Sequence, residues 1–195
     1  MLESVFRVYF LIGLIANDLL FAVDARRMKQ NRVIDDRKTG LEFPLSMLAF
    51  LGMQVIPVLY VLTSWLDFAD YHLSTWAGLV GAAIFTVALW LYWRSHADLG
   101  RNWSPLLQIK GGHSLVTHGV YQYIRHPIYA ADWLWGIAQA LLLQNWIGGL
   151  AALASVLPVY LYRVPREEQM MLEHFGEEYR LYMSRTGRVI PRLRM

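Results

Sequence analysis

Apolar residues are gathered into five runs, separated by polar or turn-forming segments. The runs are Val5–Val23, Leu45–Trp65, Thr75–Trp93, Ile128–Asn145 and Trp146–Tyr162. Each has roughly the ~20 residues that an α-helix needs to cross the hydrocarbon core of a bilayer. Because lipid offers the backbone no hydrogen-bond partners, such runs fold as helices. The pattern therefore predicts an all-α integral membrane protein with five transmembrane helices.

The last two runs are separated only by a short turn. Gln144, Asn145 and Trp146 are followed by Gly148 and Gly149, and this combination favours a tight helical hairpin. A hairpin that only enters the membrane and returns would leave the sidedness of the chain unchanged. The pattern therefore leaves open whether the hairpin crosses completely.

A polar segment follows the fifth run. Pro165 is typical of the first turn of a helix, where the acids Glu167 and Glu168 complement the positive helix end. Apolar and aromatic residues then recur at spacings of three and four, which predicts an amphipathic helix. These residues are Leu172, Phe175, Tyr179 and Tyr182. Gly187 marks the expected end of this helix.

The composition agrees with a membrane protein. Of the 195 residues, 56% are hydrophobic and 17% are charged, below the ~25% charged residues of ordinary soluble domains. The length suits one domain, with residues 1–93 as a transmembrane scaffold and residues 94–195 as a loop, the hairpin and the C-terminal helix. The absence of cysteine excludes disulfides, thiolate metal ligands and cysteine nucleophiles. A net charge of +3 gives no indication of nucleic-acid binding.

The basic residues are distributed asymmetrically along the chain. With five crossings, all but one of the 18 lysines and arginines fall on one side, in segments 24–43, 94–127 and 163–194, and the exception is Arg7. The positive-inside rule then places the N-terminus outside and the C-terminus in the cytosol. The membrane would be the cell membrane of a prokaryote or the endoplasmic reticulum of a eukaryote. Loop 94–127 is therefore cytosolic, and loops of this length are usually functional.

The stretch Gly119–Tyr129 joins this loop to the fourth run. It contains Arg125-His126-Pro127 and three tyrosines, Tyr121, Tyr123 and Tyr129. An interfacial anchor at a helix start is the simpler interpretation of the tripeptide alone. However, a helix N-terminus that faces the cytosol also attracts anions, and the tyrosines would crowd around it and offer aromatic faces to a flat or cationic ligand.

Two further polar segments are candidates for the same site. His113–Val116 follows a Gly-Gly pair and is either a turn with a short buried segment or a ligand-binding loop. Arg163 lies at the inner end of the fifth run, where a half-buried arginine is costly and is a functional candidate. The simpler interpretation of the surrounding arginines and glutamates is a solvated salt-bridge patch. The arginine fork suits a carboxylate or a phosphate because it can bind two oxygens at once.

Two acids, Asp18 and Asp132, fall inside apolar runs. Each is either a substrate or proton site, or a partner for Arg, Trp or Tyr donors within the bundle, and we favour the partner interpretation. Asp132 is the better functional candidate because it lies about one helical turn beyond the stretch Gly119–Tyr129, just inside the fourth run. The common nucleotide-binding, zinc-protease and serine-hydrolase motifs are absent from the sequence.

The polar segments together form an ordered set of motifs. They are His113-Ser114-Leu115-Val116, Gly119-Val120-Tyr121, Arg125-His126-Pro127-Ile128-Tyr129, Arg163 with Glu167-Glu168, Phe175-Gly176-Glu177-Glu178-Tyr179, and Pro191. In this order, with a helical hairpin between the halves, they resemble the isoprenylcysteine carboxyl methyltransferase family of integral-membrane enzymes. The short five-helix form, with Asn102-Trp103-Ser104 and Thr186-Gly187-Arg188, looks most like a prokaryotic member. The resemblance covers Leu99 to Pro191, roughly half of the chain.

The resemblance implies a cofactor pocket at the cytosolic end of the bundle, formed with the loop and the C-terminal helix. The methyl donor would be S-adenosylmethionine and the product S-adenosylhomocysteine. Carried over position by position, the cofactor contacts fall on Gln108, His113, Ser114, Leu115, Val116, Tyr121, His126, Pro127, Ile128, Tyr129 and Glu167. The family's substrate-binding arginine falls on Arg163, which would position the reacting carboxylate. A lipophilic, prenylcysteine-like substrate would arrive from the bilayer, and neither a metal nor a nucleic acid is implied.

Two other functions stay open. A phospholipid N-methyltransferase of the phosphatidylethanolamine type shares the Arg-His-Pro region and the Glu-Glu pair, but an amine must lose a proton, so it would need a base. Arg163 favours an anionic group. A non-catalytic lipid-binding protein is the other alternative, and the presence of both polar clusters together argues against it. The natural methyl acceptor is not determined by the sequence.

Overall fold

The computed structural model describes residues 2–28, 33–37, 39–104 and 107–192. Within these residues, three helical segments are long and apolar enough to cross a membrane, namely Leu2–Val23, Glu42–Leu62 and Thr75–Asn102. They match the first three predicted runs. The basic residues Lys29, Arg32, Lys38 and Arg194, which contributed to the predicted sidedness, lie outside the described residues.

The first segment belongs to helix α1 (Leu2–Met28), and the third to α4 (Thr75–Leu99). The second is one continuous rod made of α2 (Glu42–Phe50), a π-helical turn η1 (Leu51–Val55) and α3 (Ile56–Leu62). The π-helical turn adds an extra residue to a helix that the apolar run alone predicts to be regular. Such turns occur often at functional sites.

The predicted hairpin is confirmed as a tight turn between α5 (Pro127–Leu143) and α6 (Ala151–Phe175). Gln144 ends α5 in the left-handed conformation, with φ of 49°. Asn145 then fixes the turn, because its Nδ2 donates to the Leu66 carbonyl at 2.7 Å and its Oδ1 accepts the Gly148 N–H at 2.7 Å. The second helix begins five residues later than the apolar run suggested, because these turn residues are themselves apolar or neutral.

The prediction that a new helix begins at Pro165 is wrong. Helix α6 continues through Pro158 and Pro165 to Phe175, and a separate helix α7 spans Glu177–Arg185. Proline removes one hydrogen bond from a helix, but neighbouring groups can compensate for the loss. The carbonyl that loses its helical donor at Pro165 is that of Leu161, four residues earlier. The next carbonyl, that of Tyr162, accepts a hydrogen bond from the Arg166 side chain at 2.9 Å.

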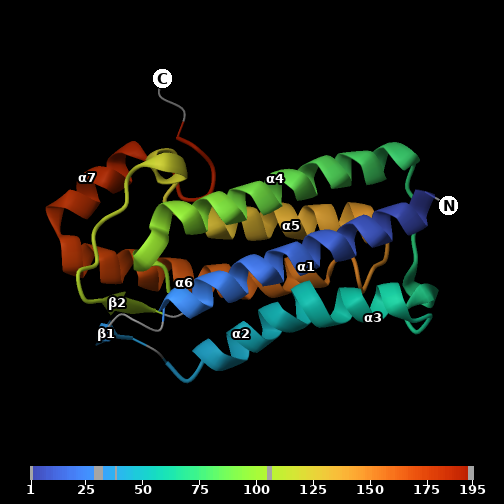
Figure 1. Cartoon of the computed structure of the whole chain (residues 1–195), viewed down its shortest axis with the longest axis horizontal. Helices are drawn as coiled ribbons and strands as arrows, with labels where there is room; N and C mark the ends of the chain where they lie inside the picture. The colour runs from blue at the N-terminus through green and yellow to red at the C-terminus, as the bar shows by residue number, and fades with distance from the viewer. Residues whose placement is uncertain (1, 29–32, 38, 105–106, 193–195) are drawn as a thin grey trace.

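The fold is mostly helical, in agreement with the prediction, and one short two-stranded sheet was not predicted. Strand β1 (Val33–Asp36) pairs antiparallel with β2 (Gln108–Lys110), joining the loop after α1 to the loop after α4. Short 3-10 turns lie at Asp67–Ala69 (η2), Gly100–Asn102 (η3) and Gly119–Gln122 (η4). The helices run side by side, with β1, β2 and α7 at the end of the bundle opposite the N-terminus (Figure 1).

The core of the bundle lies between α1, α4 and α5. Phe10 stacks on Phe85 with ring centroids 5.3 Å apart, and Phe85 meets Trp135 edge-on at 4.8 Å. The fully buried Gln139 links three elements, because its Nε2 donates to the carbonyls of Gly52 (3.1 Å) and Gly148 (2.7 Å). These contacts fix α5 against the π-helical turn and the hairpin turn. They thereby set the position of the first residues of α5, which lie at the end of that helix away from the hairpin turn.

Candidate active site

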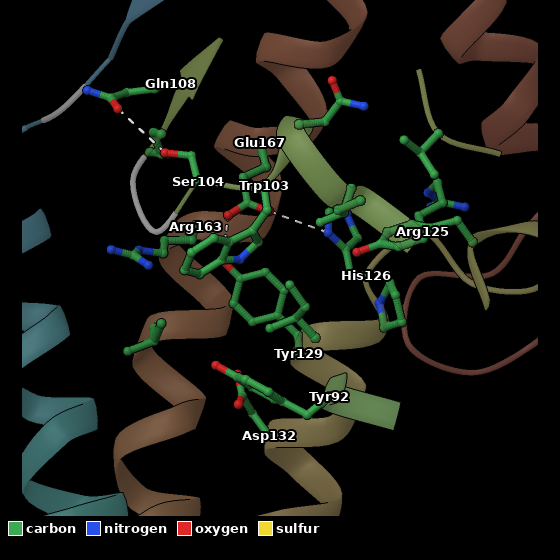
Figure 2. Close-up of a pocket in the computed structure, with 18 of the residues that line it drawn as sticks. Tyr92, Trp103, Ser104, Gln108, Arg125, His126, Tyr129, Asp132, Arg163 and Glu167 are labelled. Atoms are coloured by element: carbon green, nitrogen blue, oxygen red, sulfur yellow. Dashed lines mark hydrogen bonds and ion pairs between the residues drawn. The ribbon is translucent and has the colours of Figure 1, made fainter. Parts of the chain in front are cut away.

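A cavity of about 480 Å³ lies among α1, the α2–η1 rod, α5, α6, α7 and the loop that precedes α5. Every residue that the resemblance assigned to the site lines it. These residues are Gln108, His113, Ser114, Leu115, Val116, Tyr121, His126, Pro127, Ile128, Tyr129, Arg163 and Glu167. In Figure 2, Gln108 and Ser104 lie at one edge of the cavity and Arg125 and His126 at the other, with Tyr129 between them. The structure thus brings together segments separated by the whole hairpin.

The stretch before α5 is held by the C-terminal segment. The N–H groups of Arg125 and His126 donate to the carbonyls of Gly187 (2.8 Å) and Arg188 (2.9 Å), and the Gly187 N–H donates back to Tyr123 (3.3 Å). Two backbone donors at the start of α5 are therefore satisfied by residues about sixty positions away. The wall at Arg125–Pro127 depends on the C-terminal segment for its shape.

Upstream, the same stretch is anchored to α4 at Gly119. Asp98 Oδ2 accepts the Val120 N–H at 2.9 Å. Gly119 has φ of 60°, and a Cβ atom there would lie 2.0 Å from Asp98 Oδ2. Only glycine combines this backbone conformation with so close an approach of the carboxylate.

Glu168 joins the α5 entrance to the C-terminal segment. Its buried carboxylate accepts hydrogen bonds from Arg125 Nε (3.0 Å) and Arg188 Nη2 (2.7 Å), and lies 3.4 Å from His126 Nε2. Burial alone would raise the pKa of Glu168, but the hydrogen bonds and charges of these three residues lower it to about 2. Glu168 is therefore an ionised structural anchor, and Arg125 is occupied in binding it.

Glu167 faces the cavity from the next position on α6. Its Oε1 accepts the Tyr129 hydroxyl at 2.5 Å, and its Oε2 lies 3.5 Å from His126 Nδ1 (Figure 2). Burial alone would lower the pKa of His126, but Glu167 and Glu168 raise it. His126 is thus held between two carboxylates, which favour its protonated form.

Arg163 lies on the same helix, one turn before Glu167. Its Nη2 donates to Glu42 Oε2 at 2.5 Å and to Ser46 Oγ at 3.0 Å. Both partners come from the start of α2, and the Glu42 side chain is only 4% exposed. The two contacts fix one edge of the guanidinium group and orient its fork. Asp132, on α5, interacts electrostatically with Arg163.

The loop wall around His113–Val116 is fixed by Asn102. Asn102 Oδ1 accepts the Ser114 N–H, and Asn102 Nδ2 donates to Ser114 Oγ, both at 3.2 Å. Before β2, Ser104 Oγ lies 3.5 Å from Oε1 of Gln108, the first residue of that strand. Asn102 belongs to a tripeptide that the motif comparison included, but its supporting role needed the folded loop.

Several candidates are placed differently from their predicted positions. Tyr123 is 60% exposed and is not among the residues that line the cavity, so only Tyr121 and Tyr129 of the three tyrosines do so. Asp18 accepts a hydrogen bond from Gln54 Nε2 at 2.9 Å, where an Arg, Trp or Tyr partner was expected. Within the part of the chain that the structure describes, no group of three His, Cys, Asp or Glu side chains could hold a metal ion.

Sequence reasoning missed several residues of the cavity lining. Ser46 and Gln54 come from the second apolar run and Asn17 from the first. Glu42, just before the second run, does not line the cavity but holds Arg163, which does. Each is a polar residue inside or at the edge of an apolar run, which is a usable signal. That signal does not identify which helices face one another, so it could not assign these residues to the same cavity.

The chain resembles known proteins in both sequence and structure. Residues 79–173 match the model of the isoprenylcysteine carboxyl methyltransferase family. The human protein-S-isoprenylcysteine O-methyltransferase is 30% identical over 139 residues, 67% of this chain and 49% of the human protein. The Arabidopsis thaliana protein-S-isoprenylcysteine O-methyltransferase B is 34% identical over 94 residues, 47% of this chain and 48% of that protein. The chain thus spans about half the length of these relatives.

A solved structure has the same fold. It is that of the eukaryotic intramembrane Ras methyltransferase, an isoprenylcysteine carboxyl methyltransferase. The TM-score is 0.53 at 23% sequence identity, and the match covers 81% of this chain and 54% of the other. The matched part of this chain therefore extends well beyond residues 79–173, into the helices that carry no recognisable motif.

Proposed function

Since the chain belongs to the isoprenylcysteine carboxyl methyltransferase family, we propose that it is a membrane enzyme that transfers a methyl group from S-adenosylmethionine to the carboxylate of a lipophilic, prenylcysteine-like acceptor. One observation carries this proposal. Ten residues of the loop stretch and the start of α5, together with Glu167 and Arg163 of α6, line a single cavity. Their assigned roles come from motifs, whereas their convergence comes from the fold.

The cavity suits the proposed cofactor in size and in chemistry. Its volume of about 480 Å³ falls within the ~300–1,000 Å³ of typical small-molecule sites. Glu167 offers a carboxylate and Tyr129 an aromatic face at the centre of the wall, which suits a cationic ligand. Burial raises the pKa of the Tyr121 phenol well above its ordinary value, so this ring stays neutral.

When bound, S-adenosylmethionine would supply an electrophilic methyl group on a sulfonium centre. An α-carboxylate has a reference pKa of about 3.3–3.7, so the acceptor is already ionised at neutral pH and needs no general base. The task of Arg163 is to place the carboxylate oxygens, since effective transfer needs the reacting atoms about 3–3.5 Å apart. Glu42 offsets the charge of Arg163, which limits its stabilisation of the anion and preserves the nucleophilicity of the carboxylate.

The direct test is a methylation assay with the purified protein in detergent or nanodiscs. Labelled S-adenosylmethionine is supplied with a prenylcysteine analogue or with phosphatidylethanolamine. A base-labile product from the prenylcysteine analogue, as expected of an ester, supports the proposal. A base-stable product formed only from the phospholipid would refute it in favour of N-methylation. Failure to bind S-adenosylhomocysteine would indicate a non-catalytic protein.

We also propose five crossings, with the N-terminus outside and the C-terminus in the cytosol. The chain has no cysteine, so single cysteines can be introduced and labelled without background. The exposed Phe68 and Trp146 would lie outside, at the loop after α3 and at the hairpin turn. In intact cells or sealed vesicles, both Phe68→Cys and Trp146→Cys should react with an impermeant maleimide. Labelling of the first without the second would indicate a hairpin that does not cross.

A further inference from the structure

The cavity continues beyond the proposed cofactor and carboxylate positions into a region lined by α1 and the π-helical turn. Asn17 and Asp18 of α1 and Gln54 of η1 line this inner region. None of them belongs to a family motif that the sequence comparison used. Two exposed aromatic side chains also line the cavity, Phe21 on α1 and Phe50 at the end of α2. The inner region therefore combines polar groups with aromatic side chains.

The buried side-chain oxygen of Asn17 is the main evidence for a bound group in this region. The residue is 8% exposed and lines the cavity, and its side-chain oxygen is buried with no hydrogen-bond partner among the described residues. Buried polar atoms of native proteins nearly always have a partner, and an unpaired one is costly. An acceptor oxygen in this position is suited to a donor group of a bound molecule.

Asp18 adds a second acceptor next to it. Gln54 Nε2 donates to Asp18 Oδ1 at 2.9 Å, which orients the carboxylate across the space between α1 and η1. An ionisable side chain in a membrane-crossing segment is expensive, and such residues commonly mark substrate pathways. Asn17 and Asp18 together offer hydrogen-bond acceptors to a bound molecule. A hydrocarbon chain has no donor and would form a hydrogen bond with neither.

The π-helical turn determines where Gln54 lies. The Gly52 carbonyl accepts a hydrogen bond from the buried Gln139, and a Cβ atom on Gly52 would lie 2.3 Å from Ser155 Oγ of α6. The turn is therefore held from α5 and packed directly against α6. This rigid support is what a binding group needs if it is to be held in a fixed position.

The depth of this region relative to Arg163 follows from the α2–η1 rod. Ser46 contacts Arg163, and Gln54 lies eight residues further along the same rod. At ~1.5 Å per residue, Gln54 is about 12 Å deeper than the position where Arg163 would hold a carboxylate. An α-amino or amide group adjacent to the carboxylate cannot span this distance, so the ligand group must lie on the chain of the acceptor.

We propose that Asn17, Asp18 and Gln54 form a subsite for a hydroxyl or amino group carried on the lipophilic chain of the methyl acceptor, about 12 Å from its carboxylate. The inference rests on the proposed carboxyl methyltransferase function and narrows its substrate class. The preferred acceptor is a lipophilic acid with a polar donor in its chain, and a bare isoprenoid chain is a poorer one.

The test compares three thioether acids with chains of equal length. One chain is pure hydrocarbon, one bears a hydroxyl and one an amino group about ten bonds from the carboxylate, at ~1.2 Å per bond of an extended chain. We expect the KM of the two donor-bearing acids to be about tenfold lower than that of the hydrocarbon acid. Asn17→Leu should remove most of this advantage for both, and Asp18→Asn mainly for the amine. Thr86→Val, which removes a hydroxyl from α4 away from the cavity, is the matched control and should preserve the preference.

A second readout does not depend on turnover. The methyl esters of the same three acids cannot be methylated again, and their binding is measured as a shift of the melting temperature in the presence of S-adenosylhomocysteine. Equal KM values and equal shifts for the three chains would overturn the subsite and leave the proposed function intact. If no acid is methylated but the donor-bearing esters still give the larger shift in an Asn17-dependent way, the subsite stands and carboxyl methylation fails.

Discussion

The contact between Glu42 and Arg163 gives the sharpest test of how the carboxylate is positioned. The perturbation is Glu42→Gln, which keeps the size of the side chain and its hydrogen-bonding capacity but removes the charge. Arg163 then retains its own charge and its contact with Ser46. If the orientation of the guanidinium fork sets the approach of the acceptor, turnover should fall while cofactor binding is unchanged.

The structure sets the size of the effect. The Glu42 and Arg163 side chains are 4% and 14% exposed and their charged atoms lie 2.5 Å apart, so this is not a surface pair worth ~0–1 kcal/mol. Because Arg163 keeps its charge, Glu42→Gln replaces an ion-pair hydrogen bond by one between a charged and a neutral group, which costs about 1–2 kcal/mol. Expressed in kcat/KM for the acceptor, that is a loss of about 5–30-fold.

The assay measures initial rates at varied acceptor and, separately, the affinity for S-adenosylhomocysteine by calorimetry. Arg163→Ala should lose more activity than Glu42→Gln, and Arg163→Lys should not restore it because lysine lacks the planar fork. Glu173→Gln, which alters an exposed pair with Arg37, is the control and should change kcat/KM less than twofold. Unchanged kcat/KM in Glu42→Gln, or an equal loss of cofactor affinity and turnover in Arg163→Ala, would refute the division of roles.

Three other outcomes follow from the α6 carboxylates. Glu167→Ala should weaken S-adenosylhomocysteine binding about tenfold or more, because a charged wall group is lost, and unchanged calorimetric affinity would contradict its role. Glu168→Gln should lower the unfolding free energy by about 3–5 kcal/mol, since Arg125 is left buried without its counter-ion; a melting temperature within a degree of the parent would argue against the anchor. The pKa of His126 is raised in the folded state, so its protonated imidazole stabilises the fold through Glu167 and Glu168. This stabilisation is fully present below pH ~6.5 and is lost as the pH rises through the folded-state pKa. The melting temperature should therefore fall over that range, and His126→Gln should flatten the decline.

The motif segments quoted from the sequence converge on one cavity in the structure, whereas several of the elements that carry them were not predicted. His113–Val116, Arg125–Tyr129 and Glu167 are motif residues, and each segment lines the same cavity. Their roles stay predictions, but their convergence is a property of the fold. The hairpin turn was also predictable, because Asn145 and Gly148 are local signals in an apolar region.

The errors came from interactions that no local pattern contains. Pro165 is a helix-start signal by itself, yet α6 continues through it. On either side of it, Arg163 binds Glu42 and Glu168 binds Arg125. Pairing of β1 with β2 joins loops far apart in the sequence, and both strands are too short for a periodic signal. Glu42 and Gln54 are scarcely distinguishable from other polar residues near apolar runs until α2 is placed against α6 and α1.

The hairpin described above carries both walls of the cavity, with His126–Tyr129 at the start of α5 and Arg163–Glu167 on α6. A helix responds to a bilayer of different thickness mainly by tilting. Since α5 and α6 share one turn fixed by Asn145, they should tilt together, and the spacing of the two walls is insulated from lipid chain length. Within the described residues, no such turn joins α1 to η1 around the inner region. Lipid thickness should therefore alter how readily an acceptor reaches the cavity from the bilayer more than it alters the rate of the transfer step.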